Sequence, residues 1–177
     1  MLVGVVSDTH GNQEGMHRLA ELLRAAGVST LLHVGDDYRD LAFLAREGLT
    51  VLGVPGVYCP EYSDPQIPNR QVVEVNGVKV LLTHTETRHR LDAPQDPDPQ
   101  APARGVKVVI YGHSHLPALQ ERAGVLWLNP GHLKDRTDKG HPPTFALLRL
   151  TPERAEVEIR RLEDNAVVLR EAHQLPI

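Results

Sequence analysis

The sequence predicts an α/β fold, a four-layered α/β/β/α sandwich of two mixed sheets with flanking helices. Through residues 1–54, short apolar runs alternate with segments of helical periodicity, which favours parallel strands joined by right-handed crossovers. From residue 71 onward most segments have strand character, which indicates a second sheet. A length of 177 residues, 41% of them hydrophobic, suits one domain spanning residues 1–177.

The first part of the chain is predicted as strand, helix, strand, helix, strand. The strands are apolar runs of the kind that is buried on both faces, at 2–6, 31–34 and 50–54. Apolar positions of the first helix recur at helical spacing: Met16, Leu19, Ala20, Leu23 and Ala26. Gly27 ends that helix. The second helix has a predicted buried face of Leu41, Leu44 and Ala45.

The second part is predicted to be mainly strands. Asn76-Gly77, the favoured pair for a two-residue turn, joins strands at 71–75 and 78–82 into a hairpin. Further strands are expected at 106–111, 125–128, 144–150 and 155–161, and residues 166–169 form one more strand or a short helix. Prolines at 94, 97, 99 and 102 exclude a helix from 92–103, which is predicted to be an ordered lid or a mobile loop.

Composition excludes several classes of protein. The net charge of −4 argues against binding nucleic acid mainly by phosphate neutralisation. Apolar runs fall short of the roughly 20 residues of a membrane span, and no basic leader precedes the first strand, so we expect a soluble, cytoplasmic protein without a membrane partner. The lone cysteine, Cys59, excludes a disulfide framework and a multi-cysteine zinc site.

Histidines and aspartates gather where predicted strands end. Six do so: Asp8, His10, Asp36, His84, His113 and His115. Because sites in open α/β sheets form at the carboxyl ends of the strands, these side chains are expected to converge. In D-x-H and H-x-H, one residue separates two ligands, which puts both side chains on the same side of an extended segment.

This donor set predicts a metal centre. Carboxylate and imidazole together suit Mn, Fe, Zn or Ni better than Ca or Mg. Six donors exceed the three protein ligands that one catalytic zinc-type ion takes. Two ions sharing a bridging carboxylate use the whole set, and such pairs are a recurring device for hydrolysing phosphate esters.

The motifs around these residues resemble, in order, those of calcineurin-like metallophosphoesterases, above all the small YfcE-like phosphodiesterases. They are Ser7-Asp8-Thr9-His10-Gly11, Gly35-Asp36, Leu82-Thr83-His84, Gly112-His113-Ser114-His115 and Asn129-Pro130-Gly131. The resemblance implies that Asp36 bridges two ions. It also implies how the other five divide: Asp8, His10 and His115 at the first ion, His84 and His113 at the second. We expect Mn, with Ni, Fe, Zn or Co as alternatives.

The chain departs from this family after the third predicted strand. Where the family has an Asn that completes the second ion's ligands, this chain has Val57, which cannot bind a metal. Either Glu61, Cys59 or Asp64 supplies the ligand from the same loop, or the second ion binds weakly, or the site binds metal without turnover. The proton donor to the leaving group is Tyr58 or a solvent water.

Several polar residues near the motifs have structural interpretations. Asn12 is expected to cap the first helix, Asp37 to form a turn, and His33 to be a packed core histidine. His132, where the family often has Ser, either contacts the bound phosphate or closes its turn. The remaining histidines are expected at the surface: His17, His89, His141 and His173.

These observations together predict a metal-dependent phosphodiesterase with a metal-bridging hydroxide as nucleophile and with Asp36 and His84 as catalytic residues. The substrate is a small phosphodiester or phosphomonoester, and no stable nucleic-acid complex is expected. One alternative is a metal-binding scaffold with weak or no catalysis, as in a eukaryotic sorting-complex subunit with this fold. Another is a DNA nuclease, which the acidic net charge disfavours. Exposed sheet edges favour a homodimer.

Overall fold

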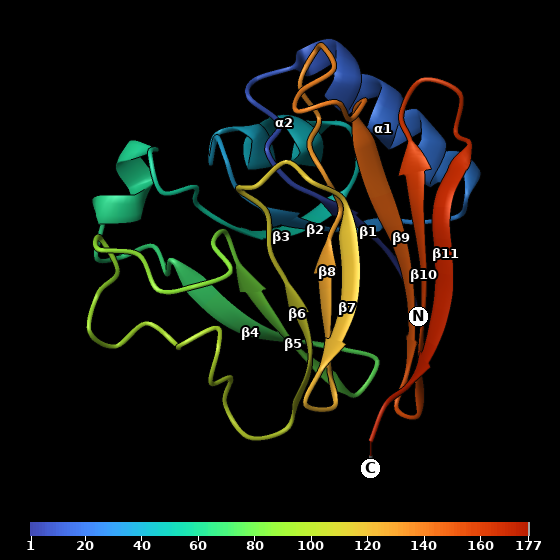
Figure 1. Cartoon of the computed structure of the whole chain (residues 1–177). Helices are drawn as coiled ribbons and strands as arrows, with labels where there is room; N and C mark the ends of the chain where they lie inside the picture. The colour runs from blue at the N-terminus through green and yellow to red at the C-terminus, as the bar shows by residue number, and fades with distance from the viewer. Residues whose placement is uncertain (177) are drawn as a thin grey trace.

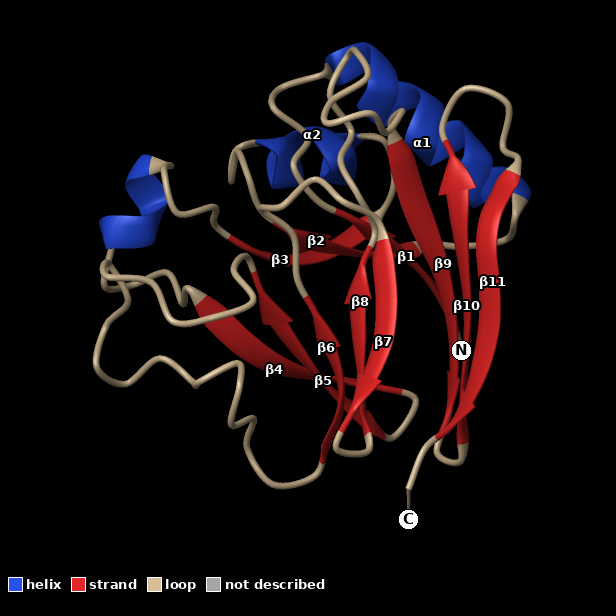
Figure 2. Ribbon diagram, in the orientation of Figure 1, coloured by secondary structure: helices blue, strands red, loops and turns tan. Residues whose placement is uncertain are grey.

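Two mixed β-sheets packed face to face form the centre of the molecule, as a computed structural model describing residues 1–176 shows (Figures 1 and 2). Both α-helices of the described residues pack against the outer face of the larger sheet. The fold class predicted from the sequence is confirmed. One detail of the predicted four-layered sandwich differs. In the described residues, the outer face of the smaller sheet is covered by no α-helix and carries a cluster of large side chains, among them Tyr111 and Trp127.

The larger sheet has six strands in the order β11-β10-β9-β1-β2-β3. Neighbours among β1, β2 and β3 are parallel, whereas β9 pairs antiparallel with β1, and β10 and β11 continue antiparallel. The strands are β1 (Leu2–Val6), β2 (Thr30–Val34), β3 (Thr50–Val54), β9 (Thr144–Thr151), β10 (Arg154–Arg161) and β11 (Val167–Gln174).

The smaller sheet has five strands in the order β4-β5-β6-β8-β7. The β5–β6 and β6–β8 pairs are parallel, and the outer pairs are antiparallel. Asn76 and Gly77 have φ of +51° and +77°, as the predicted hairpin turn requires. The strands are β4 (Arg70–Val75), β5 (Val78–Thr83), β6 (Val106–Ile110), β7 (Ala118–Arg122) and β8 (Val125–Asn129).

Helix α1 (Gln13–Ala25) begins and ends as predicted. Asn12 Oδ1 accepts a hydrogen bond from the Gly15 amide at 3.0 Å, and Gly27 takes the left-handed conformation that stops the helix. In helix α2 (Asp40–Arg46), Ala45 was predicted to lie on the buried face, but it is exposed. A single 3₁₀ turn, η1 (Pro60–Ser63), follows β3. In the part of the chain that the structure describes, no helix is long and apolar enough to cross a membrane.

The core lies between the two sheets. Inward-facing Val and Leu side chains of both sheets form its largest cluster, and a second cluster joins Met16, Leu19 and Leu23 of α1 to the outer face of the larger sheet. Burial of both faces explains why β1 and β2 are apolar runs rather than alternating sequences.

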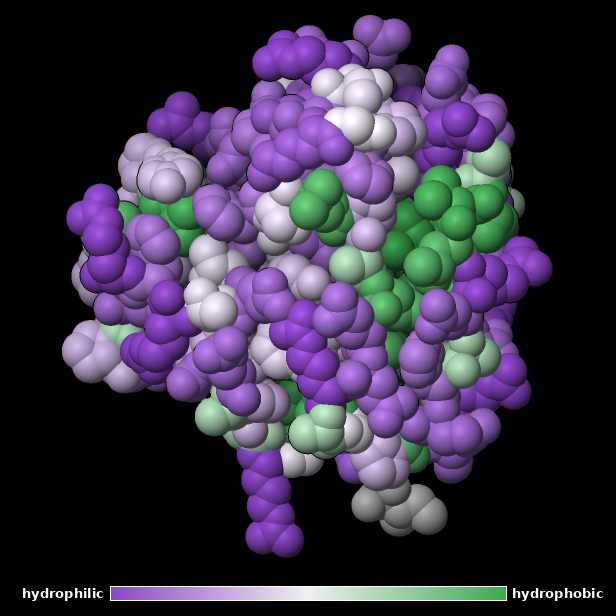
Figure 3. Space-filling view, in the orientation of Figure 1, coloured by the Kyte–Doolittle hydropathy of each residue, from purple (hydrophilic) through white to green (hydrophobic). Residues whose placement is uncertain are grey.

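Two strands differ from the expected set. β7 was not predicted, because its sequence, ALQER, is only half-buried and lacks apolar alternation. Of the two alternatives predicted for residues 166–169, a strand or a short helix, the structure has the strand. This strand, β11, begins at Val167 and continues to Gln174. β11 is an edge strand with Val167 and Val168 largely exposed, and Figure 3 shows apolar surface on the right-hand side, where β9, β10 and β11 run.

Candidate metal centre

Strand ends of both sheets supply the six predicted donors. Asp8 and Asp36 each lie two residues beyond a parallel strand of the larger sheet, β1 and β2. His84 directly follows β5, and His113 and His115 lie in the loop after β6 of the smaller sheet. All these loops leave the carboxyl ends of their strands, as predicted.

The backbone at the donors is unusual. Asp8, His10, His113 and His115 have φ between +50° and +64°, the left-handed region. Non-glycine residues pay about 1–3 kcal/mol each for such conformations, which gather at functional sites. The D-x-H and H-x-H pairs are thus brought together by alternating left-handed residues. This differs from the extended backbone that their spacing predicts.

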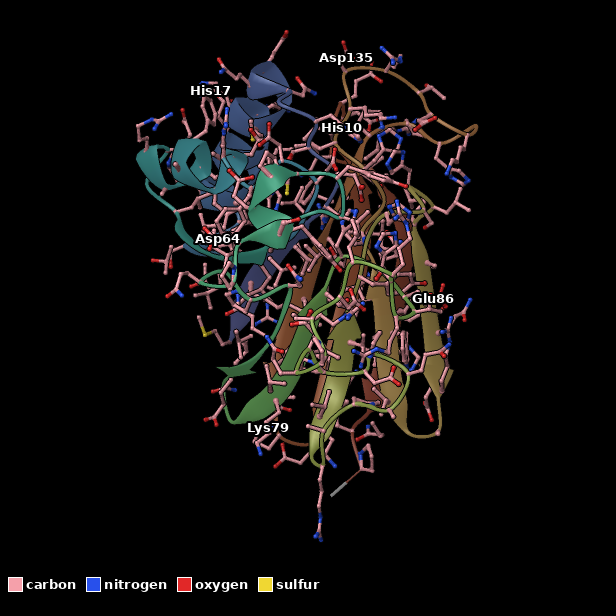
Figure 4. The ribbon with its side chains drawn as sticks, turned by 90° about the vertical axis from the view of Figure 1, so that its left-hand side faces the viewer. His10, His17, Asp64, Lys79, Glu86 and Asp135 are labelled. Atoms are coloured by element: carbon pink, nitrogen blue, oxygen red, sulfur yellow. The ribbon has the colours of Figure 1, made fainter. Side chains whose placement is uncertain are left out.

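Asp8, His10 and His115 form one cluster, in which one donor atom from each lies within 4.8 Å of the others. His115 Nε2 is 3.2 Å from Asp8 Oδ1 and 3.3 Å from His10 Nε2. Figure 4 shows His10 in the upper part of the molecule, above the strands. Three of the six predicted donors therefore share one small volume.

The two oxygens of Asp8 have different surroundings. Oδ2 accepts hydrogen bonds from Ser7 Oγ at 2.6 Å and from the His113 amide at 2.9 Å. Oδ1 is left to face His115. Burial raises the pKa of Asp8, but the hydrogen bond from His115 and the charge of His84 outweigh it, so the pKa lies below its ordinary value. The carboxylate is ionised, the form that binds metal.

Asp36 lies beside this cluster, with Oδ2 2.8 Å from His10 Nδ1. The hydrogen bond with His10 lowers the pKa of Asp36 despite partial burial. Gly56 packs so closely against it that an added Cβ would come within 2.9 Å of Oδ1. One oxygen of Asp36 thus contacts His10, and the other lies close to the loop after β3.

His84 and His113 form a second pair. His84 is buried, and its Nδ1 donates to the Val34 carbonyl at 2.8 Å. The other ring nitrogen of His84, Nε2, lies 3.2 Å from His113 Nδ1. Partial burial and the neighbouring charge of His84 keep the pKa of His113 below its ordinary value. The two imidazoles thus bring one ring nitrogen each to the same place, where both would be available to one cation.

Two glycines allow the site's loops to approach each other. A Cβ on Gly112 would collide with Ser7 Oγ and lie 2.6 Å from Asp8 Oδ2. A Cβ on Gly35, which has φ of +89°, would collide with the His84 ring. The glycines next to the donors are therefore required by packing as well as by chain direction.

Asp138 is a residue of the site that the sequence did not indicate. Its Oδ2 accepts a hydrogen bond from His115 Nδ1, and Lys134 Nζ donates to the same oxygen at 2.8 Å. This contact directs His115 Nε2 toward Asp8. The contacts with Asp8 and Asp138 also raise the pKa of His115. Asp138 lies outside every motif, 23 residues beyond His115, so no local pattern reveals it.

The donors fit a divalent transition metal. In the cluster, Nε2 of His115, the ring nitrogen not bonded to Asp138, lies 3.2 Å from the ionised carboxylate of Asp8, so a single cation between them would be bound by both. Carboxylate oxygens and imidazole nitrogens are the mixed donor set of such ions. The cluster of Asp8, His10 and His115 supplies three ligands, the number typical of a catalytic site.

The loop after β3 contains no Asn near the second pair. Val57 is buried at 2% exposure, and the Tyr58 side chain is exposed with its ring 6.1 Å from that of His113. Cys59 Sγ donates to the Gly56 carbonyl at 2.9 Å. Glu61 lines a cavity of about 330 Å³ that Asp36 also lines.

Other polar residues near the motifs have structural roles. His33 is fully buried, bonds Thr9 Oγ1 at 3.1 Å, and has its pKa lowered to about 4 by burial. Asp37 Oδ1 accepts from the Arg39 amide in a turn. His132 bonds the backbone at both ring nitrogens, which favours turn closure over phosphate contact. Of the four histidines expected at the surface, only His17 is exposed, and the other three are half-buried: His89, which lies between Tyr58 and Tyr62, His141 and His173.

A match to a family model identifies the family to which the chain belongs. The model for the calcineurin-like phosphoesterase superfamily domain matches residues 1–153. The chain belongs to this superfamily. It is therefore a metallophosphoesterase, a hydrolase of phosphoester bonds in a family that uses divalent metals.

Curated relatives of this superfamily match most of the chain. A probable metallophosphoesterase of Methanothermobacter thermautotrophicus is 28% identical over 166 residues, which cover 91% of this chain and 92% of the relative. Phosphodiesterase MJ0936 of Methanocaldococcus jannaschii is 27% identical over 145 residues, 74% of this chain and 83% of the relative.

Solved structures of similar fold include YfcE, a phosphoesterase from E. coli, with a TM-score of 0.71 and 23% identity over 97% of this chain and 98% of that one. Vps29 of Entamoeba histolytica, complexed with Zn²⁺, has a TM-score of 0.68 and 21% identity over 98% and 99% of the two chains. At these identities the likeness establishes the fold.

Proposed function

We propose that this metallophosphoesterase hydrolyses small phosphodiesters at a dinuclear centre of divalent transition metals, with Mn as the expected ion. The observation that carries the proposal is the continuous set of donors. The cluster of Asp8, His10 and His115 touches Asp36 through His10, and the His84–His113 pair touches Asp8 through the His113 amide. A phosphodiesterase among the curated relatives supports the choice of substrate class.

Each donor has a proposed role. Asp8, His10 and His115 would hold the first ion, His84 and His113 the second, and Asp36 both. Bound divalent ions supply charge neutralisation at the phosphoryl oxygens and lower the pKa of water. The buried His84, fixed by the Val34 carbonyl, keeps its Nε2 directed at the centre. The leaving group would take its proton from Tyr58 or from solvent.

We further propose that residues 1–177 form one such domain and that the loops around Tyr58 and residues 92–103 contact the organic groups of the substrate. Tyr58 is 75% exposed beside His113, in position to meet a substrate group. A cytoplasmic location and a homodimer paired through an edge strand stay predictions.

The test compares two neighbouring aspartates. Asp36→Asn removes the proposed bridging charge and is expected to abolish Mn-dependent hydrolysis of bis-p-nitrophenyl phosphate, lowering kcat by at least about 100-fold. Asp37→Asn changes a turn residue next to it and is the matched control, with activity near that of the unmodified chain. Release of p-nitrophenol is followed by absorbance. Unaltered activity in Asp36→Asn would rule out the proposed centre.

A second candidate function is a metal-binding scaffold without turnover. The buried Val57, in place of a polar ligand, favours it, as does the similarity of fold to Vps29, a vacuolar protein sorting protein. Equilibrium dialysis against Mn distinguishes the two functions. Stoichiometric metal without hydrolysis of any tested diester supports the scaffold, and metal with turnover supports the enzyme.

A further inference from the structure

One carboxylate beside the candidate centre is incompletely bonded. Among the described residues, only two buried side-chain nitrogen or oxygen atoms have no hydrogen-bond partner, and Glu61 Oε2 is one of them. Its other oxygen lies 3.7 Å from Arg39 Nε, and the Arg39 side chain is 79% exposed. The Glu61 side chain is 20% exposed, but its Oε2 atom is buried, and a buried carboxylate oxygen without a partner requires an explanation.

We propose that Glu61 is the protein ligand that completes the second metal position, in the place where this chain has Val57. The proposal rests on the dinuclear centre proposed above. It assigns a role to a residue of η1 that lies outside all five motifs. The carboxylate of Glu61 would replace a neutral amide.

The position of Glu61 supports this role. Glu61 and Asp36 line the same cavity of about 330 Å³, together with Tyr58 and Cys59. A Cβ added to Gly56, at the start of this loop, would lie 2.9 Å from Asp36 Oδ1, whereas the other oxygen, Oδ2, contacts His10. The loop that carries Glu61 therefore packs directly against the second oxygen of the bridging carboxylate.

The other candidate ligands of the loop are less suitable. Cys59 Sγ donates to the Gly56 carbonyl, and burial raises the pKa of its thiol, whereas a metal needs the thiolate. Asp64 is exposed, accepts a hydrogen bond from the Gln66 amide at 2.9 Å, and lines a different cavity. Figure 4 shows Asp64 well apart from His10.

A carboxylate at this position changes the chemistry of the centre. Compared with an amide it lowers the charge of the donor set by one, which strengthens binding of a hard cation such as Mn²⁺. It also reduces the positive charge available to a phosphate anion. The chain is therefore expected to hold its second ion firmly despite the missing Asn, and to bind free phosphate more weakly once both ions are present.

The test counts metal ions and does not depend on turnover. Isothermal titration of the metal-stripped chain with Mn²⁺ is expected to give two ions per chain. Glu61→Ala is expected to keep the first ion and to raise the dissociation constant of the second by at least about ten-fold. Glu61→Gln, which keeps an oxygen and the side-chain shape, should fall between the two and guards against a folding defect.

Controls lie in the same loop. Cys59→Ser and Asp64→Asn should leave both dissociation constants unchanged. Val57→Asn added to Glu61→Ala should restore the second ion, because it returns an oxygen ligand to the loop. Thermal melting of each variant reports whether it is folded.

The outcomes separate the two proposals. Two ions of unchanged affinity in Glu61→Ala would overturn the role of Glu61 and leave the dinuclear enzyme standing. Loss of the second ion in Cys59→Ser or Asp64→Asn, with Glu61→Ala unaffected, would assign the ligand elsewhere. A single ion in the unmodified chain would contradict the dinuclear centre itself, and the role of Glu61 with it.

Discussion

Two histidines of the candidate centre each have one ring nitrogen hydrogen-bonded to a residue outside the donor set. The other ring nitrogen is therefore the one available to a cation. His84 Nδ1 donates to Val34, and His115 Nδ1 donates to Asp138. The Nε2 atoms of both residues point into the site, toward His113 and Asp8. Residues that bind no ion themselves thus fix the tautomers and ring orientations on which metal binding depends.

The contact between Asp138 and His115 leads to a testable prediction about a single residue. Asp138→Asn weakens the acceptor that orients His115 and is expected to raise the dissociation constant of the first Mn²⁺ by about 10–100-fold, without preventing folding. Asp135→Asn is the matched control, because Asp135 is 73% exposed and forms an ion pair with its neighbour Arg136. Calorimetry measures both, and equal affinities in the two variants would show that Asp138 does not act through His115.

The site residues predicted from the sequence are those with a local signature. D-x-H, G-D and H-x-H are short motifs after apolar runs, and the structure brings their side chains together. Asp138 has no such signature, because it reaches His115 from a separate loop through tertiary packing. Glu61 was indicated only as one of three candidates in the loop after β3, and its role as a ligand is the proposal made above. The left-handed backbone at Asp8 and His115 also has no signature, since it follows from how the loops close.

At the scale of elements, the strands that could be predicted are those whose apolar sequence indicates that they are buried. β1, β2 and β5 are buried over most of their length and were predicted within one residue at each end. β7 is half-exposed, and its strand conformation comes from pairing with β8. The sequence of β7 itself gives no sign of this pairing. Ala45 was misassigned because α2 is short and its interior contact is made chiefly by Leu44.

The proline-rich segment 92–103 is held against the smaller sheet by a buried ion pair. Arg70 Nη1 of β4 lies 2.5 Å from Asp92 Oδ2, and Tyr62 OH donates to the other oxygen of Asp92. Both partners of the ion pair are almost fully buried. Arg70 also donates to Thr83 and Thr85, next to His84. The segment thus corresponds to the ordered alternative, anchored beside the site.

Removing this anchor is expected to cost stability. Asp92→Asn leaves the Arg70 charge buried without a counter-charge and should lower the free energy of unfolding by about 3–5 kcal/mol. It should also make residues 93–104 more sensitive to proteolysis. Asp98→Asn, in the same segment and outside the ion pair, is the control. Urea denaturation and limited proteolysis measure the two effects, and identical profiles for both variants would refute the anchoring role.

At the scale of the whole molecule, the two sheets contribute complementary donors. Loops that follow strands of the larger sheet carry Asp8, His10 and Asp36, and Glu61, the third proposed carboxylate ligand, follows β3 of the same sheet. The smaller sheet carries His84, His113 and His115. The sheets pack through one apolar core, which brings their strand ends together. The layer arrangement was predictable from strand and helix periodicity, but the close approach of the two sets of loops depends on packing at Gly35 and Gly112.

The most direct test of the dinuclear phosphodiesterase is a single titration. The metal-stripped chain is titrated with Mn²⁺ while hydrolysis of bis-p-nitrophenyl phosphate is followed at a protein concentration well above the dissociation constants. The proposed centre predicts almost no activity without metal and a rise in rate that levels off at two equivalents of Mn²⁺ per chain. Full activity in the metal-free chain, or no hydrolysis with two ions bound, would contradict it.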